Sequence, residues 1–323
     1  MTALQLGRGE RWALVSAIAY TVVNVTLRSA APTIDGALGS LIRLIPVAVI
    51  AWVFVARDGA RDFRPSGPGF IGWRLIVALV VGGAGSFVLG NILYFSALRE
   101  GGLGITAGGI QSGSVLGGIW MGFLFLRERP RNVQLAAAGL IILGLVAIGW
   151  AQTAALHERW WLGLVLALAA GTTYAFANAT ARAVQRRRPL LWVTLAASSF
   201  GGMVPLTLIV LIRVAGGEHL AVDGPSAGVV FMAGFANAVA LGGLAMAVRH
   251  APVASVNTIS SASIVFSFVA SVTIFGEAGS AAMILGILFV TAGIVVAQLR
   301  RGPAAEVPEG VAPDGGTAAP GPA

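Results

Sequence analysis

The chain is an almost unbroken series of apolar stretches of about 20 residues, separated by short runs of Arg, Gly and Pro. That length is what an α-helix needs to cross the hydrocarbon core of a bilayer. Hydrophobic residues make up 57% of the 323 residues and charged residues 11%, whereas about a quarter are charged in soluble proteins. The pattern therefore predicts an all-α integral membrane protein.

Charged residues, Pro and Gly divide the chain into ten apolar segments. They cover residues 12–31, 36–56, 71–98, 102–126, 132–152, 160–183, 190–213, 226–249, 252–276 and 279–299. A β-barrel is not expected, because the segments lack a period of two and are about twice as long as a membrane strand. We expect ten transmembrane helices, the first of them retained and not cleaved as a signal peptide, because it is long for one.

The basic residues indicate the orientation in the membrane, since cytoplasmic loops carry an excess of Arg and Lys. All 21 are Arg. With the N-terminus in the cytoplasm, the inside holds Arg8, Arg11, Arg57, Arg61, Arg64, Arg74, Arg127, Arg129, Arg131, Arg182, Arg186, Arg187, Arg188, Arg249, Arg300 and Arg301. The outside holds Arg28, Arg99, Arg159 and Arg213. This bias predicts that both termini lie in the cytoplasm. We expect the protein in the plasma membrane.

The chain also repeats itself at a separation of about 150 residues. The matching positions are Ala97-Leu98-Arg99 with Ala247-Val248-Arg249, Glu128 with Glu277, and Gly144 with Gly293. Five spans in each half require the second copy to be inverted relative to the first, an arrangement typical of transporters. We expect a cytoplasmic N-terminus (1–11), two five-helix repeats (12–152 and 160–299) and a disordered cytoplasmic tail (300–323), rich in Pro, Gly and Ala.

Several motifs resemble the EamA family of the drug/metabolite transporter superfamily. They are "LFLRERP" and its counterpart "IFGEAG", the following "GLIILGLVAI" and "GILFVTAGIVVA", and "LIRLIPVAVI" in the second span. The resemblance covers Arg11 to Leu299. It implies that spans 3, 4, 8 and 9 surround a transport pathway and that spans 5 and 10 lie at the periphery. Ala19-Tyr20-Thr21 stands where many relatives carry Trp-Gly, so no substrate is inferred from that position.

Polar residues inside the spans are the candidates for substrate contact, because they are expensive in hydrocarbon. The candidate residues are Asn24, Arg43, Asn91, Tyr94, Gln111, Ser114, Tyr174, Asn178, Asn237, Asn257 and Ser260. For each Asn, a bond between helices is an equally good interpretation. The glycines of the fourth span and the serines at 263, 267 and 271 of the ninth are read as close helix packing, through small-xxx-small spacing.

Arg43 has two interpretations that the sequence leaves open. A mid-membrane Arg costs about 2.5–3.5 kcal/mol on insertion scales, so its presence needs a reason. The long side chain can extend to the headgroups. Alternatively, the guanidinium faces a cavity, where it could bind a substrate carboxylate through two hydrogen bonds.

Other chemistries find no support in the residues. The chain has no Cys, no Walker motif, no mid-span carboxylate and no His at metal-ligand spacing, so we expect no cofactor, no metal and no enzyme activity. The Arg residues lie between spans and do not form a face, which argues against nucleic acid. Exposed glycine faces could mediate a homodimer or be used by internal packing.

The leading hypothesis is a secondary transporter, expected to export a small organic solute such as an amino acid, metabolite or drug, by alternating access. Its partners would be that solute and the lipid bilayer. The alternatives are a non-transporting membrane protein, such as a lipid-handling factor, and a channel.

Overall fold

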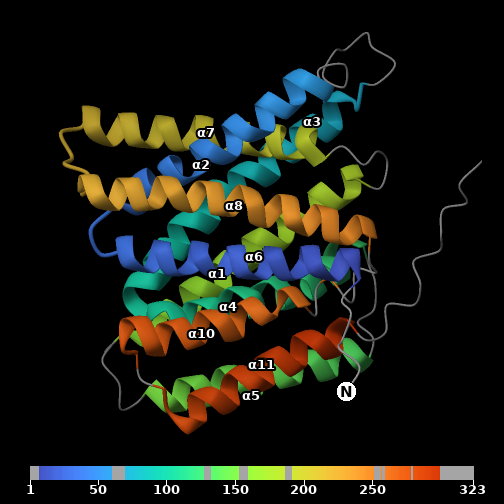
Figure 1. Cartoon of the computed structure of the whole chain (residues 1–323), viewed down its shortest axis with the longest axis vertical. Coiled ribbons are helices and arrows are strands. Elements are labelled where there is room, and N and C mark those ends of the chain that lie inside the picture. Colours follow the sequence, from blue (N-terminus) through green and yellow to red (C-terminus); the bar gives the residue numbers. More distant parts are fainter. Residues whose placement is uncertain are drawn as a thin grey trace, which may run out of the picture.

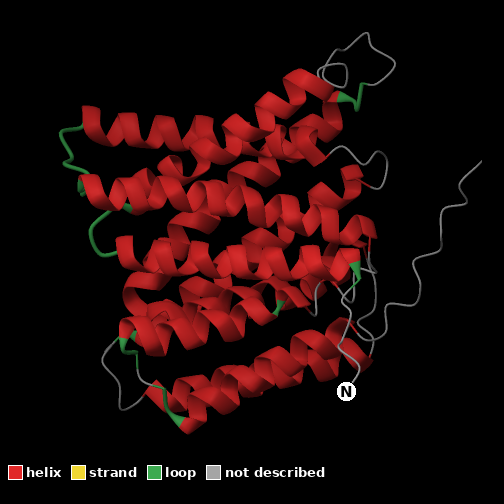
Figure 2. Ribbon diagram, in the orientation of Figure 1, coloured by secondary structure: helices red, strands yellow, loops and turns green. Residues whose placement is uncertain are grey.

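The computed structural model describes residues 7–59, 70–126, 132–152, 159–185, 191–250, 256, 259–277 and 279–298. The regular elements in these ranges are helices, as Figure 2 shows. They are α1 (Arg8–Ala30), α2 (Gly36–Phe54), η1 (Val55–Gly59), α3 (Trp73–Gly83), η3 (Ala84–Gly90), α4 (Asn91–Leu126), α5 (Asn132–Gln152), α6 (Trp160–Gln185), α7 (Leu191–Ala215), α8 (Gly224–His250), α10 (Ala262–Phe275) and α11 (Ala281–Gln298). The predicted tail, residues 300–323, lies outside the described residues.

Six helical stretches are long and apolar enough to cross a membrane. They are Arg8–Ala30, Gly36–Arg57, Trp73–Trp120, Trp160–Asn178, Leu191–Ala215 and Gly224–Ala247. Three shorter apolar helices are Leu135–Ile148, Ala262–Phe275 and Ala281–Val296. The prediction of a helical multi-pass membrane protein is therefore confirmed, whereas the count of ten spans stays a prediction.

The longest stretch reverses direction at Gly102, whose φ of 72° lies in the left-handed region that favours glycine. The contacts of this stretch with α6 demonstrate the reversal. Before Gly102 the contacting pairs are Gly82 with Thr180, Gly90 with Tyr174, and Gly101 with Gly163; after it they are Gly109 with Ala167, Gly113 with Leu168, and Gly117 with Thr172. Residues 73–101 therefore run antiparallel to α6, and residues 103–126 run parallel to it.

The helices lie side by side in one bundle, with α2 and α7 at one edge and the pair of α5 and α11 at the other (Figure 1). Helices α1 and α6 lie between these edges, and α4 and α10 separate them from the α5 and α11 pair. Close approach depends on glycine: a Cβ on Gly113 would lie 2.2 Å from the Leu168 carbonyl oxygen. This confirms the packing interpretation of the glycines in the fourth predicted span.

The contacts between α5 and α11 repeat themselves with the two helices exchanged. Gly144 packs against the Gly286 carbonyl and Val290, and Gly293 packs against the Ala137 carbonyl and Ile141. Adding 149 to the α5 residue numbers converts one set of contacts into the other. The paired residue numbers rise on one helix as they fall on the other, so the two helices are antiparallel. A twofold axis perpendicular to them would produce this arrangement.

Candidate functional site

A group of polar side chains, which we call the central cluster, lies inside the apolar bundle. It consists of Tyr20 and Asn24 of α1, Arg43 of α2, Asn91 and Tyr94 of α4, Tyr174 of α6 and Ser267 of α10. Arg43 is only 6% exposed, and its Nη2 donates to Asn91 Oδ1 at 2.5 Å. The Arg43 side chain therefore points into the bundle and not toward the headgroups, in agreement with the second of the two interpretations that the sequence left open.

Glycine and a π-helical turn bring Asn91 to this position. The turn η3 ends at Gly90, directly before Asn91, and such turns are frequent at functional sites. A Cβ on Gly90 would lie 2.5 Å from Thr173 Oγ1 and 2.7 Å from Tyr174 Cε1. Because Gly90 has no side chain, α6 comes close enough for the Tyr174 hydroxyl to donate to Asn91 Oδ1 at 2.7 Å.

A second chain of hydrogen bonds crosses the cluster from α4 to α10. The Tyr94 hydroxyl donates to Asn24 Oδ1 at 2.5 Å, and Asn24 Nδ2 donates to Ser267 Oγ at 3.0 Å. Ser267 is fully buried, so the Asn24 amide uses both its acceptor and one donor within the bundle. The sequence interpretation of Ser267 as a packing residue omitted this bond.

All three tyrosines of the chain surround Arg43. Its guanidinium carbon lies 5.8 Å from the centre of the Tyr94 ring, within the range of a cation–π contact. Tyr20 and Tyr174 are within electrostatic range of the same charge. Tyr20 was not among the predicted site residues. It stands four residues before Asn24 and therefore on the same face of α1, and this spacing was the signal in the sequence that could have found it.

The remaining predicted site residues lie outside the central cluster or outside the described residues. Gln111 and Ser114 are half-buried on α4, and Asn178 is exposed one turn beyond Tyr174 on α6. Asn237 is 7% exposed on α8, three residues after Gly234, which packs against Arg43 and Pro46 of α2. Ser260 Oγ is buried without a hydrogen-bond partner. Asn257 lies outside the described residues. A role in substrate binding stays a prediction for all of them.

One end of the bundle carries a network of charges and backbone groups. We call it the Arg28 end and define it by residues 28–36, 98–104, 159–163, 213–224, 275–277 and 279–280, which lie at the left of Figure 1. Glu277 accepts from Arg28 Nε at 3.0 Å and from the backbone N–H groups of Leu103 and Gly104 at 2.8–3.1 Å. These N–H groups begin a helical segment, where a carboxylate is favourable.

Gly102 is required for this arrangement as well as for the reversal of the chain. A Cβ at Gly102 would lie 2.5 Å from Glu277 Oε1. Arg28 in addition donates to the Leu98 carbonyl at 2.9 Å. The Glu277 carboxylate, which follows α10, is thereby joined to both α1 and α4.

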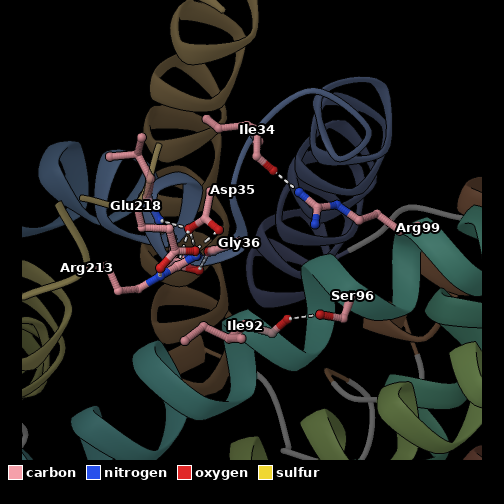
Figure 3. Close-up of polar contacts among 11 residues, drawn as sticks. Ile34, Asp35, Gly36, Ile92, Ser96, Arg99, Arg213 and Glu218 are labelled. Carbon is pink, nitrogen blue, oxygen red and sulfur yellow. Dashed lines mark hydrogen bonds and ion pairs between the residues drawn. The ribbon is translucent and has the colours of Figure 1, made fainter. Parts of the chain in front are cut away.

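A second group at the Arg28 end joins α2 to α7 (Figure 3). Arg213 Nη1 donates to both carboxylate oxygens of Asp35 at 3.0 and 3.1 Å, and Asp35 also caps the N-terminus of α2. The Arg213 guanidinium holds the pKa of Glu218 below its usual value through a hydrogen bond. Arg99 donates to the carbonyls of Ala31 and Ile34. Three of the four Arg residues predicted outside thus have polar partners here.

The described residues contain no group of three or more His, Cys, Asp or Glu side chains that could hold a metal ion. What they offer is an interior with one cationic group, three phenol rings and several amide and hydroxyl groups. Such a set can bind a small molecule through hydrogen bonds and ring contacts. Among the described side chains of the central cluster, no nucleophile is paired with a general base.

Comparison with protein-family models gives a match to the EamA-like transporter family over residues 7–150 and 161–298, one match in each half. The chain belongs to the EamA-like transporter family. This confirms the resemblance drawn from the sequence motifs and makes the protein a membrane transporter of the drug/metabolite transporter superfamily. The central cluster of this EamA-like transporter combines helices from both matched regions.

A solved crystal structure is similar to this EamA-like transporter over most of both chains. The TM-score is 0.60 at 16% sequence identity, and the alignment covers 90% of this chain and 96% of the other. At that identity the likeness concerns the fold alone. The comparison with curated proteins found no match.

Proposed function

We propose that the protein is a secondary transporter that exports a small organic solute across the plasma membrane by alternating access. In this proposal the moving parts derive from two inverted five-helix repeats, residues 12–152 and 160–299. The exchange symmetry of the α5 and α11 contacts supports the inverted relation. The outward direction follows from the resemblance to the EamA family.

The observation that carries the proposal is the central cluster. Its hydrogen bonds link α1, α2 and α4 of the first repeat to α6 and α10 of the second, inside a bundle whose exterior is apolar. Polar groups at this depth usually line a solute pathway or bind one another. A polar site between two packed groups of helices can be opened to either side when these groups change their relative position.

The Arg28 end would be closed in the conformation described. Glu277 of the second repeat is bonded to Arg28 and Leu103 of the first, and both side chains of the ion pair are largely shielded from solvent. Opening this end would require these bonds to break. The opposite end would then close over the central cluster.

Flux in proteoliposomes tests the proposal. The purified full chain would be reconstituted and supplied with labelled amino acids, organic acids and organic cations, with protein-free liposomes as the control. We expect saturable uptake of at least one solute and acceleration by the same unlabelled solute on the other side. Unsaturable flux would indicate a channel, and no flux of any solute would contradict transport.

Cysteine labelling tests the orientation separately, because the chain has no Cys of its own. Arg8 and Glu218 are both exposed. Helix α1 begins at Arg8 at one end of the bundle, and the connection from α7 to α8, which contains Glu218, lies at the other end (Figure 1). In intact cells, an impermeant maleimide should label Glu218→Cys and should not label Arg8→Cys until the membrane is permeabilised. The reverse result would place the termini outside.

A further inference from the structure

Arg43 is a buried cation without an anion. Within the described part of the chain, its contacts are Asn91 Oδ1 at 2.5 Å, the Tyr94 ring and Tyr174, all of which are uncharged. A guanidinium does not lose its proton in proteins. The cation therefore persists in the interior, and nothing in its described surroundings neutralises it.

The adjacent amide adds unused donors to this cation. Asn91 is 1% exposed, and its Oδ1 accepts from both Arg43 and Tyr174. These two donors fix the orientation of the amide, because the flipped form would place its NH₂ group against the guanidinium. Asn91 Nδ2 is left buried with no hydrogen-bond partner. Buried polar groups are nearly always paired, so an orphan donor beside an unneutralised cation indicates that an acceptor is missing.

We propose that the missing acceptor is a carboxylate of the transported solute, bound by the Arg43 guanidinium and Asn91 Nδ2. This assignment rests on the proposed function and specifies its substrate class. A planar guanidinium matches the two oxygens of a carboxylate. One cation balances a monoanion, whereas a phosphate dianion would leave excess negative charge in the cluster. Tyr20, Tyr94 and Tyr174 provide ring surfaces for the remainder of the solute.

Matched ligand pairs test this inference on the purified full-length protein. The probes are 3-phenylpropionate against 3-phenylpropionamide, L-phenylalanine against L-phenylalaninamide, succinate and inorganic phosphate. The readout is the rise of the thermal-unfolding midpoint with probe concentration. We expect at least one carboxylate to bind at least tenfold more tightly than its amide, and phosphate to have no effect.

Substitution of Asn91 provides a test that does not depend on removing a buried group. Asn91→Asp places a carboxylate beside Arg43, so the variant should unfold at or above the wild-type midpoint and lose at least tenfold in carboxylate affinity. Arg43→Gln should lose affinity to the same extent. Asn132→Asp makes the same chemical change at an exposed position on α5 and should bind as the wild type does.

The outcomes separate this inference from the proposed function. Equal binding of carboxylates and amides, stronger binding of phosphate, undiminished binding by Asn91→Asp, or no response to any carboxylate would overturn the inference. If proteoliposomes move an uncharged or cationic solute while carboxylates are ignored, transport stands and the inference fails. If the same preparation binds carboxylates but moves no solute, the carboxylate site is supported and the proposed transport is contradicted.

Discussion

Arg28 and Arg43 are both largely buried arginines of apolar helices, yet their surroundings differ completely. The Arg28 side chain is 14% exposed and bonds to Glu277 and to the Leu98 carbonyl. Arg43 is 6% exposed and has only uncharged partners among the described residues. The charge of Arg28 is used by the fold itself, whereas that of Arg43 remains available to a ligand.

The presence or absence of a buried anionic partner distinguishes a structural cation from a candidate binding cation. A buried ion pair is self-sufficient, and removing either partner leaves the other uncompensated. A buried cation without an anion has no such partner, so its removal should cost the fold little. Stability measurements on matched variants can therefore show whether the two arginines differ in this way.

The largest expected effect is on the ion pair itself. Glu277→Ala leaves Arg28 unpaired and removes the acceptor of the Leu103 and Gly104 N–H groups. Losing one member of a buried pair costs about 3–5 kcal/mol, so we expect a loss of that order in the free energy of unfolding. Thermal unfolding in detergent measures it. Glu218→Ala is the control, because its pair with Arg213 is exposed and should contribute little.

Replacing each arginine by methionine gives the most direct comparison. Arg28→Met leaves Glu277 buried without its cation and should destabilise by about 3 kcal/mol. Arg43→Met leaves no carboxylate behind, so its stability should be unchanged or raised by about 1 kcal/mol. The same unfolding assay measures both variants. A loss for Arg43→Met as large as that for Arg28→Met would mean that Arg43 is also a structural cation.

A smaller effect is expected from Tyr94→Phe. The substitution removes the hydroxyl that donates to Asn24 Oδ1, while Asn24 keeps its bond to Ser267. Hydrogen bonds between membrane helices contribute about 0.6 kcal/mol on average and up to about 1.7, so the loss should fall in that range. Thr26→Val, which removes a hydroxyl that donates to the Val22 and Val23 carbonyls within α1, is the control for a bond that joins no two helices. A loss several times larger would show that the cluster acts cooperatively.

The smallest effect concerns the dependence of stability on pH. Hydrogen bonds from Arg213 and from Ser226 lower the pKa of Glu218 and of Asp223, respectively. A carboxylate with a lowered pKa stabilises the fold above its ordinary pKa, 4.5 for Glu and 3.8 for Asp, and this contribution is lost as pH falls through the lowered value. Unfolding midpoints should therefore be flat from neutral pH down to about pH 5 and fall below it. The fall should be shallower in Glu218→Gln and Asp223→Asn.

Much of the fold could be predicted, because spanning a membrane depends on length and apolarity within one segment. The boundary between residues 98 and 102 was placed from sequence, and the chain does reverse at Gly102. The glycines at 109, 113 and 117 pack on α6 as their spacing predicted. These features are local, so they need no knowledge of partner helices.

The site could be predicted only in part, since it depends on which helices meet. Asn24, Arg43, Asn91, Tyr94 and Tyr174 were singled out as costly groups, and the structure brings them together, while their role in substrate binding stays a prediction. The direction of Arg43 could not be predicted, because its side chain is long enough for either orientation. Glu277 lies between two predicted spans, and its contact with Leu103 requires the three-dimensional approach of α10 to α4.

The position of α6 has a consequence for how the protein could be divided or rearranged. Although it belongs to the second matched region, α6 packs along both antiparallel segments of residues 73–126, and α1 correspondingly packs on α8 and α10. The first helix of each repeat thus packs against helices of the other repeat. A fragment ending after Gln152 would expose the glycine surfaces that α6 covers, so separately produced halves should be soluble in detergent only as a reassembled pair. Each group of helices that moves as a unit during a transport cycle should therefore contain helices from both repeats. The hinges should lie between these packed groups and not at the sequence boundary of the repeats.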